Sequence, residues 1–580
     1  MNLTLLPRFV ALCCVSLTFA SITRAADDYV PGPDSKSQEG VPKGELIKGT
    51  YTSGEKSVFP GGYRDYTVYL PQQLDRSKPA PFMVLQDGGG YSAPTVFDNL
   101  IHRKEIPALI GVFIGHSRVK ALNTNALDRF NRSYEYDGLG DSYARFLIEE
   151  FFPMIESKHG LKLSTNPGDG SIGGASSGAI CAFTAAWERP DRFSRVFSSV
   201  GTYVGLRGGN NYATLLRKTE PKAIRIFLQD GSGDLNIYGG DWWMANQEME
   251  RSFIFAGYDV NHIWGDGAHN GKHSTAIFPD ALRWLWRDYP APIQANPEGK
   301  SKVQTTSLMD GGWEVVSTGH KFTEGPTANA KGELFFTDIP NSRIHKIALD
   351  GKVSVFAEDT GNANGLKFGP DGRLYACANG KKQIVAYDDT GKASVVADGL
   401  ESNDLTITQD GRIYVTDPNN KQVWLIQKDG AKQVVDKGLN FPNGVCLSPD
   451  QSLLYVADMK GRFIWSYQIA ADGTLAAKQR YYHLHLADGS TQSDADGMTV
   501  DAEGRLYVTT EMGVQFCDQA GRVNGILDKP QKAWLSNVAF GGADLKTLYV
   551  TCGDKVYKRA TKVKGVLTFN APIRPKPPGL

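Results

Sequence analysis

A serine between glycines is the clearest candidate for chemistry in this sequence. The run Gly174–Gly178 (GASSG) follows a strand-like stretch at residues 170–173 and precedes the helical pattern AICAFTAAWERP. This strand, turn and helix setting is typical of a nucleophile elbow, in which small flanking residues allow a tight turn that exposes the serine hydroxyl. It predicts Ser176 as the nucleophile of an acyl-transfer reaction.

The expected partners of such a serine are an acid and a histidine that follow it in that order. Asp234 comes after the strand-like run RIFLQDG, and His269 lies in GDGAHNGKH. We predict that His269 takes the serine proton as general base while Asp234 holds the imidazole in the correct tautomer. Asp230 and Asp241 remain competing acids and His273 a competing base, with a solvated loop side chain as the alternative for each.

Acyl transfer also needs backbone amides that stabilise the oxyanion of the transition state. The glycine-rich run 86–90 (QDGGG) follows the strand-like FMVL, where such donors are expected. We predict that the amides of Gly88 and Gly89 form the oxyanion hole together with the amide of Ser177. An ordinary turn is the alternative interpretation of these glycines.

A second set of polar side chains recurs through the C-terminal half, about ten residues before each copy of a repeated β segment. Each is an acid or an amide: Glu324, Asn364, Asn403, Asn443, Asp496 and Asn537. Equivalent positions in six repeats would bring their oxygens together, and such oxygens suit a hard cation. We predict a divalent metal, most simply Ca²⁺, with Mg²⁺, Mn²⁺ or Zn²⁺ as alternatives. Simple turn formation is the competing explanation.

The serine motif lies in a region of alternating strand-like and helix-like patterns. Runs such as DYTVYL and ALIGVFIG alternate with helical runs such as ARFLIEEFFPMIESKHG and PDALRWLWRDYP. This alternation predicts a parallel sheet with covering helices over residues 61–290. Residues 26–60 are predicted to be a loose arm and residues 291–307 a polar interdomain linker.

Residues 308–570 change to short β segments separated by turns. A motif such as GELFFTD, GRLYACA or GRIYVTD occurs six times, with 39 to 52 residues between copies. This spacing predicts a six-bladed β-propeller with one four-stranded blade per repeat. The longest spacing includes LHLADGSTQSDAD, a predicted loop insertion, and residues 571–580 are a predicted Pro-rich tail.

Composition and the N-terminal segment restrict partners and compartment. The 580 residues carry 63 basic and 63 acidic side chains without a basic patch, which argues against nucleic-acid binding. An apolar run at residues 9–22, too short to span a membrane, predicts a signal peptide over residues 1–25 and a secreted or periplasmic protein. An uncleaved anchor and a lipid-modified Cys13 are the alternatives. The five later cysteines lack zinc-site spacing and are expected in apolar packing.

Residues 61–290 resemble the Putative esterase family, which includes enterochelin esterases and feruloyl or acetyl xylan esterases, through LQDGGG, GGASSG, LQDGSGDLN and GDGAHNGKH. The resemblance implies an α/β-hydrolase fold and assigns Ser176, Asp234 and His269 as nucleophile, acid and base. It leaves the acyl group open, while export favours esters of extracellular carbohydrate. Trp242, close to the proposed acid, is a candidate substrate contact, with burial in the core as its alternative.

The region from about residue 313 to residue 566 resembles the gluconolactonase and regucalcin (senescence marker protein) family of six-bladed propellers, through FTEGP, NGLKFGPDGRLYACAN, FPNGV and DADGM. The resemblance implies that Glu324, Asn443 and Asp496 hold the metal. Asn403 is a further ligand or substrate contact, and Asp496 is a candidate general base.

Two further ring residues, Asn364 and Asn537, are predicted to contact substrate. One departure from the family concerns the segment GLESNDL, where many relatives have an Arg shortly before the Asn-Asp pair and this chain has Glu401. The choice of substrate therefore stays open.

These features predict a multidomain ester hydrolase, an α/β-hydrolase followed by an all-β propeller. We expect a serine carboxylesterase of feruloyl or acetyl type joined to a metal-dependent sugar lactonase. One alternative is a single esterase whose propeller is a metal-stabilised module that binds carbohydrate or a partner, and another is a pair of non-catalytic receptors. Small-molecule or carbohydrate esters and lactones are the expected substrates, without a stable membrane span. The oligomeric state is left open.

Overall fold

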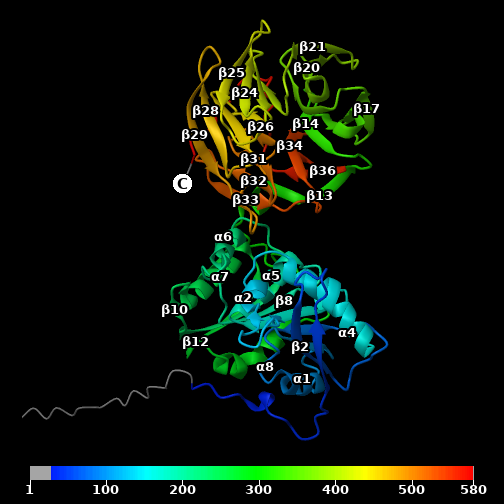
Figure 1. Ribbon diagram of the computed structural model, residues 1–580, viewed down its shortest axis with the longest axis vertical. Helices are drawn as coiled ribbons and strands as arrows, with labels where there is room; N and C mark the ends of the chain where they lie inside the picture. The colour runs from blue at the N-terminus through cyan, green and yellow to red at the C-terminus, as the bar shows by residue number, and fades with distance from the viewer. Residues whose placement is uncertain (1–27, 579–580) are drawn as a thin grey trace, which may run out of the picture.

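The computed structural model describes residues 28–578, so the predicted signal peptide lies outside the described residues. Figure 1 shows an α/β region and a β region arranged one above the other along the longest axis. Within the described residues, no helix is long and apolar enough to cross a membrane.

A ten-stranded sheet organises the N-terminal region. Six neighbouring strands run parallel in the order β12, β9, β8, β7, β3, β4, as predicted. The other four strands pair antiparallel at one side, so the sheet is mixed. The strands are β1 (Glu45–Thr52), β2 (Gly62–Leu70), β3 (Phe82–Leu85), β4 (Ile110–Ile114), β5 (Arg118–Val119), β6 (Arg129–Phe130), β7 (Gly170–Ala175), β8 (Arg195–Ser199), β9 (Arg225–Gly233) and β12 (Asp259–Ala268).

Helices cover both faces of this sheet. One apolar core packs α1 and α8 on one face, and a second core packs α4, α5 and α7 on the other. The helices are α1 (Ala93–His102), α2 (Arg132–Tyr136), α3 (Ser142–Arg145), α4 (Phe152–His159), α5 (Ser177–Glu188), α6 (Tyr212–Leu216), α7 (Trp242–Ala256) and α8 (Lys272–Trp286). A small hairpin, β10 (Asn236–Ile237) and β11 (Gly240–Asp241), precedes α7.

The predicted loose arm of residues 26–60 is wrong for residues 45–52, which form a strand of the sheet. Residues 45–52 form β1, which pairs along its whole length with β2. Upstream, the Asn99 side chain donates to the carbonyls of Asp34 and Lys36, and Arg283 pairs with the Asp34 carboxylate at 2.5 Å. Contacts with distant residues therefore order a segment that has no hydrophobic periodicity of its own.

The C-terminal region is a six-bladed β-propeller, as the repeats predict. Five blades are continuous: β14–β17, β18–β21, β22–β25, β26–β29 and β30–β33. The sixth combines β34, β35 and β36 with β13 from the start of the region, which closes the ring. The five described cysteines, all buried and without disulfides, include four in this region.

The propeller strands have the following bounds: β13 (Met309–Ser317), β14 (Thr323–Ala328), β15 (Leu334–Asp338), β16 (Arg343–Ile347), β17 (Val353–Ala357), β18 (Ala363–Phe368), β19 (Leu374–Ala378), β20 (Gln383–Tyr387), β21 (Ala393–Asp398), β22 (Leu405–Ile407), β23 (Ile413–Asp417) and β24 (Gln422–Ile426). The remaining blades contain β25 (Lys432–Lys437), β26 (Pro442–Leu447), β27 (Leu453–Asp458), β28 (Phe463–Ile469), β29 (Leu475–His483), β30 (Met498–Val500), β31 (Leu506–Thr510), β32 (Gly513–Cys517), β33 (Val523–Leu527), β34 (Leu535–Gly541), β35 (Thr547–Cys552) and β36 (Lys555–Thr561). The predicted insertion is the loop between β29 and β30.

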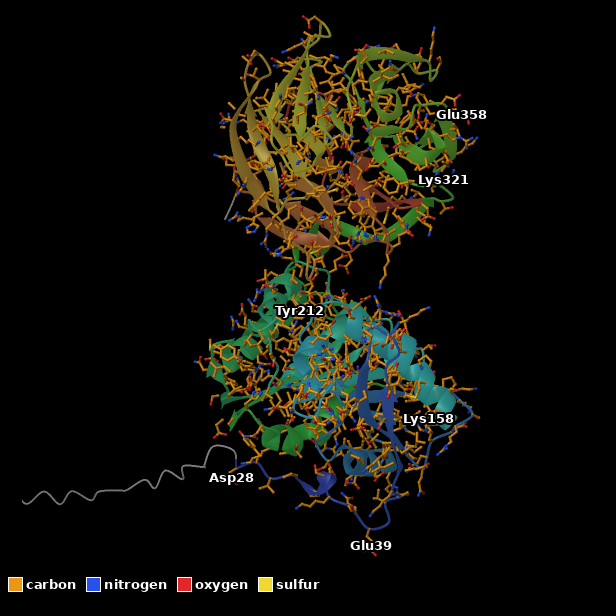
Figure 2. All side chains as sticks on the ribbon, in the orientation of Figure 1. Asp28, Glu39, Lys158, Tyr212, Lys321 and Glu358 are labelled. Atoms are coloured by element: carbon orange, nitrogen blue, oxygen red, sulfur yellow. The ribbon has the colours of Figure 1, made fainter. Side chains whose placement is uncertain are left out.

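The two regions meet along blades five and six. The Ile526 amide in β33 donates to the Lys218 carbonyl at 2.8 Å, and Arg559 in β36 binds the Glu220 carboxylate through two nitrogens. Figure 2 shows Tyr212 of α6 on the side of the α/β region nearest the propeller. The predicted linker ends in helix α9 (Gln304–Leu308), which packs against β33.

Candidate active sites

Ser176 lies at the sharp turn between β7 and α5. Its φ of 58° and ψ of −123° are unusual for a residue other than glycine, and such strain concentrates at functional sites. A Cβ on Gly174 would meet the Gly178 backbone at 2.6 Å, and a Cβ on Gly178 would meet the Gln86 side chain at 2.9 Å. Glycine on both sides is therefore what allows this turn to form.

Ser176, His269 and Asp234 form one hydrogen-bonded chain. Nε2 of His269 lies 2.9 Å from Ser176 Oγ, and Nδ1 of the same ring lies 2.5 Å from Asp234 Oδ1. The three residues follow the carboxyl ends of the parallel strands β7, β12 and β9, which open at the same edge of the sheet. Donation of Nδ1–H to the carboxylate leaves Nε2 able to accept the serine proton.

The competing acid Asp230 lies against Asp234, and both carboxyls are buried. Burial, followed by the neighbouring Asp234, raises the pKa of Asp230 to about 9. Burial acts to raise the pKa of Asp234 as well, but hydrogen bonds from His269 and Asp230 outweigh it and lower that pKa. A protonated Asp230 donates to Asp234, so this buried pair carries one negative charge behind the imidazole.

The other two competitors have structural contacts elsewhere. Asp241 caps the N-terminus of α7 by accepting the backbone amide of its third residue at 3.0 Å. Nδ1 of His273 lies 3.1 Å from the Gln229 side-chain amide, and its ring stacks on Tyr29. His269 is therefore the imidazole that contacts the Ser176 hydroxyl.

The predicted oxyanion role of Gly88 and Gly89 is wrong. The Gly88 amide donates to the Ile114 carbonyl at 3.0 Å, and the Gly89 amide donates to the Gln86 carbonyl at 3.1 Å. The Gly88 amide therefore fixes the loop to β4, and the Gly89 amide closes a turn within the loop. Ser177, the third predicted donor, opens α5, where amides of the first turn have no acceptor inside the helix.

A further amide of this loop, that of Asp87, has only a long contact of 3.4 Å with the Tyr136 hydroxyl. Arg132 binds the Asp87 carboxylate through Nε and Nη2, both at 2.8 Å, and its Nη2 also lies 3.3 Å from the Ala175 carbonyl. Arg132 thus fastens the glycine-rich loop to the turn that carries the serine. Arg132 was not predicted from the sequence, because it is distant from both motifs along the chain.

Trp242 does not line an open pocket, because its residue surface is only 3% exposed. Its indole N–H donates to Thr202 Oγ1 at 3.2 Å, and its ring meets His269 edge-on. The same Thr202 hydroxyl lies 3.2 Å from Ser176 Oγ. Trp242 is therefore wrong as a predicted substrate contact, and it packs beneath the imidazole together with Thr202.

In the propeller, the six predicted ring residues occupy equivalent positions at the start of each innermost strand. In four blades this residue is paired through the backbone with a threonine of the second strand. These pairs are Glu324 with Thr337, Asn403 with Thr416, Asp496 with Thr509, and Asn537 with Thr551. The repeat alignment therefore located the ring correctly, and Asn364 and Asn443 complete it.

The ring residues contact one another and neighbouring polar groups. Asn537 Nδ2 donates to Glu324 Oε2 at 2.9 Å, and the Trp534 indole donates to Asp496 Oδ2 at 2.7 Å. Among the described residues, the side-chain oxygen of Asn364 is buried without a hydrogen-bond partner. Trp534 was missed because it belongs to a loop before the last innermost strand.

Asp404 is a further buried carboxyl, and it was not predicted as a site residue from the sequence. It follows Asn403, at the position where four other blades have glycine, and it is 7% exposed. Burial, followed by the charge of Asp404, raises the pKa of Glu324 to about 7, and burial with Glu324 raises the pKa of Asp496. The signal in the sequence is the departure from the repeat, NDL beside NGL and NGV.

The donor set fits a hard divalent cation. The innermost strands of a propeller surround a central channel. The carboxyls of Glu324, Asp404 and Asp496 are buried there close enough to affect one another, with the buried amides of Asn443 and Asn537, and buried carboxylates need positive charge. Oxygen ligands of this kind are those that Ca²⁺ and Mg²⁺ prefer. Glu324, Asn443 and Asp496 are the residues that would hold such an ion, with Asn403 and Asn364 beside them.

Comparisons with known proteins agree with this division. Residues 57–307 match the family described as Putative esterase, and residues 322–554 match the SMP-30/Gluconolactonase/LRE-like region. A gluconolactonase of Zymomonas mobilis is 28% identical over 292 residues, 43% of this chain and 82% of the relative. A pentonolactonase of Haloferax volcanii is 27% identical over 247 residues, 41% of this chain and 83% of the relative.

A solved gluconolactonase structure from Xanthomonas campestris is 25% identical, with a TM-score of 0.39, and covers 43% of this chain and 89% of that protein. The chain thus joins an esterase-type region to a gluconolactonase-type region. Both families hydrolyse ester or lactone bonds, and the chain is a hydrolase of that class.

Proposed function

We propose that the N-terminal region is a serine carboxylesterase of the α/β-hydrolase type. The observation that carries this proposal is the chain of contacts from Ser176 Oγ through His269 to Asp234. Ser176 attacks the ester carbonyl while His269 takes its proton, and His269 then donates that proton to the leaving alcohol. The amides of Ser177 and Asp87 are the donors that we assign to the oxyanion.

The substrates that we propose are acyl esters of carbohydrate, of feruloyl or acetyl type. The predicted signal peptide supports this choice, because an exported esterase meets polymeric or oligomeric carbohydrate outside the cytoplasm. Hydrolysis of methyl ferulate, p-nitrophenyl acetate and acetylated xylo-oligosaccharides by the full chain tests it. Cleavage of p-nitrophenyl acetate alone would contradict the carbohydrate assignment while leaving the esterase intact.

We also propose that the propeller is a metal-dependent sugar lactonase. The three buried carboxyls of the channel and the similarity to a gluconolactonase support this activity. A bound divalent cation would supply Lewis-acid polarisation of the lactone carbonyl. Glu324 and Asn443 hold and orient the site, and Asp496, fixed by Trp534, is the group that accepts a proton.

The competing proposal is a propeller that only binds carbohydrate or a partner. Turnover of glucono-1,5-lactone by the full chain with added Ca²⁺, and its loss in chelator, distinguishes the two. Lactone hydrolysis equal to the background rate under both conditions would overturn the lactonase and favour the binding module.

A further inference from the structure

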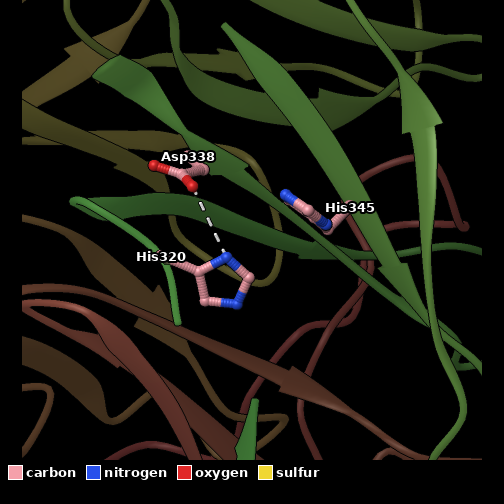
Figure 3. A group of neighbouring side chains, drawn as sticks. All are labelled: His320, Asp338 and His345. Carbon is pink, nitrogen blue, oxygen red and sulfur yellow. Dashed lines mark ion pairs between the residues drawn. The ribbon is translucent and has the colours of Figure 1, made fainter. Parts of the chain in front are cut away.

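A cluster of two histidines and an aspartate lies in the first blade, apart from the channel residues. His320 precedes β14, Asp338 ends β15 and His345 lies in β16. One ligand atom from each residue lies within 4.8 Å of the others. Figure 3 shows the three side chains around a common point, with the His320 ring facing the Asp338 carboxylate.

Both nitrogens of the His320 ring face an oxygen atom. Nε2 lies 2.7 Å from Ser317 Oγ, whereas Nδ1 lies 3.5 Å from Asp338 Oδ2. The second distance is too long for a good hydrogen bond. It matches the edge of a tetrahedron with metal–ligand bonds of about 2.1 Å, which is roughly 3.4 Å. A histidine that ligates a metal commonly gives its other N–H to an oxygen, as the Ser317 hydroxyl allows.

The other two side chains are also fixed in place. Asp338 Oδ1 accepts the amides of Lys321 and Phe322, and Oδ2 accepts the Asn341 side chain at 2.7 Å. His345 is 8% exposed, and its Nε2 is buried without a hydrogen-bond partner among the described residues.

The fourth blade provides an internal comparison. Its Asp458 pairs with the start of β26 as Asp338 pairs with the start of β14, and it too accepts two amides of the preceding loop. The residue equivalent to His345 is Trp465, whose indole lies 3.4 Å from Asp458. The residue equivalent to His320 is the buried Leu439.

The third blade repeats the tryptophan arrangement, since Trp424 donates to Asp417 at 3.1 Å. Beside this aspartate, blade four therefore has an apolar residue and an indole, whereas blade one has two imidazoles. The propeller fold does not require histidine at these places. Neither the leucine nor the indole of blade four could bind a metal ion, whereas both imidazoles of blade one can.

We propose that His320, Asp338 and His345 bind a divalent transition-metal cation of the zinc type, with water in the remaining position. Two imidazoles and one carboxylate select Zn²⁺ over Ca²⁺, which prefers oxygen ligands. The His320 segment crosses from the closing blade to the first, where the His320 amide donates to the backbone carbonyl of Asp554 at 3.3 Å. The ion therefore joins this crossover to β15 and β16 and stabilises ring closure.

The test uses the full chain, stripped with chelator and dialysed against Zn²⁺ in excess Ca²⁺. His345→Trp and His320→Leu introduce the residues that blade four carries, and Glu324→Gln is the matched change in the channel. We expect the unaltered protein and Glu324→Gln each to bind one more Zn²⁺ per chain than either histidine variant. Zinc should also raise the melting temperature only where both histidines are present.

Equal zinc content in the unaltered chain and His345→Trp would overturn the proposal, as would zinc lost from Glu324→Gln and kept by His345→Trp. If the histidine variants fail to fold, anomalous scattering at the zinc edge from crystals of the unaltered protein decides the question. An anomalous peak between His320, Asp338 and His345 supports the site. Electron density at that point without an anomalous peak contradicts it. Neither result depends on esterase or lactonase activity.

Discussion

Asp230 lies directly against Asp234 behind the His269 imidazole, and burial with this neighbour raises the pKa of Asp230 to about 9. One carboxyl of the pair therefore acts as a hydrogen-bond donor while the other carries the charge that orients the histidine. The acid of this triad is a pair of residues with one shared negative charge.

The two members of this pair should respond differently to substitution. Asp234→Asn removes the charge that selects the imidazole tautomer, so kcat should fall about 10⁴-fold. Asp230→Asn keeps a donor of the same shape, so kcat should fall less than about tenfold. Both are measured with p-nitrophenyl acetate. Equal losses in the two variants would contradict these roles.

The same pair predicts a pH dependence of stability. The pKa of Asp230 is about 9 in the folded chain against 3.8 ordinarily, so between these values the folded state binds more protons than the unfolded state. This carboxyl therefore lowers the free energy of unfolding as pH rises. Asp230→Asn should exceed the unaltered protein in melting temperature by an amount that grows from about pH 5 to about pH 8.5. A constant difference would argue against a protonated Asp230.

Arg132 is expected to act through position, since it binds the Asp87 carboxylate with two nitrogens. Lysine cannot reproduce this planar two-bond contact. Arg132→Lys should lower kcat about 10- to 100-fold with little change in KM, because the oxyanion donors shift relative to Ser176. An unchanged kcat in steady-state measurements would show that Arg132 does not position the oxyanion donors.

The carboxyl of Asp404 should make the propeller depend on a cation. Asp404→Gly introduces the residue that four other blades have at this position. It also removes a carboxyl whose pKa is raised by burial. In chelator, this variant should melt at a higher temperature than the unaltered chain. The rise on adding Ca²⁺ should be smaller, as scanning calorimetry measures. An equal calcium response in both proteins would place the ion away from Asp404.

Much of this architecture follows from short-range patterns. The glycines around Ser176 specify a local turn, and the blade repeat places equivalent residues at equivalent points, so the triad and the ring were predictable. The oxyanion donors were not predictable, because the Gly88 amide donates to the Ile114 carbonyl of β4, a contact that exists only in the folded chain. The burial of Trp242 and the entry of β1 into the sheet likewise depend on distant contacts.

The two hydrolytic centres that we propose for this chain should act independently, and a comparison of two variants on two substrates decides whether they do. Ester and lactone hydrolysis are measured for the unaltered protein, Ser176→Ala and Asp496→Ala, each with Ca²⁺ and with chelator. We predict that Ser176→Ala loses only ester cleavage, by at least about 10³-fold, whereas Asp496→Ala and chelator remove only lactone cleavage. Loss of both activities in Ser176→Ala, with neither changed in Asp496→Ala, would mean that the chain has a single hydrolytic centre at Ser176.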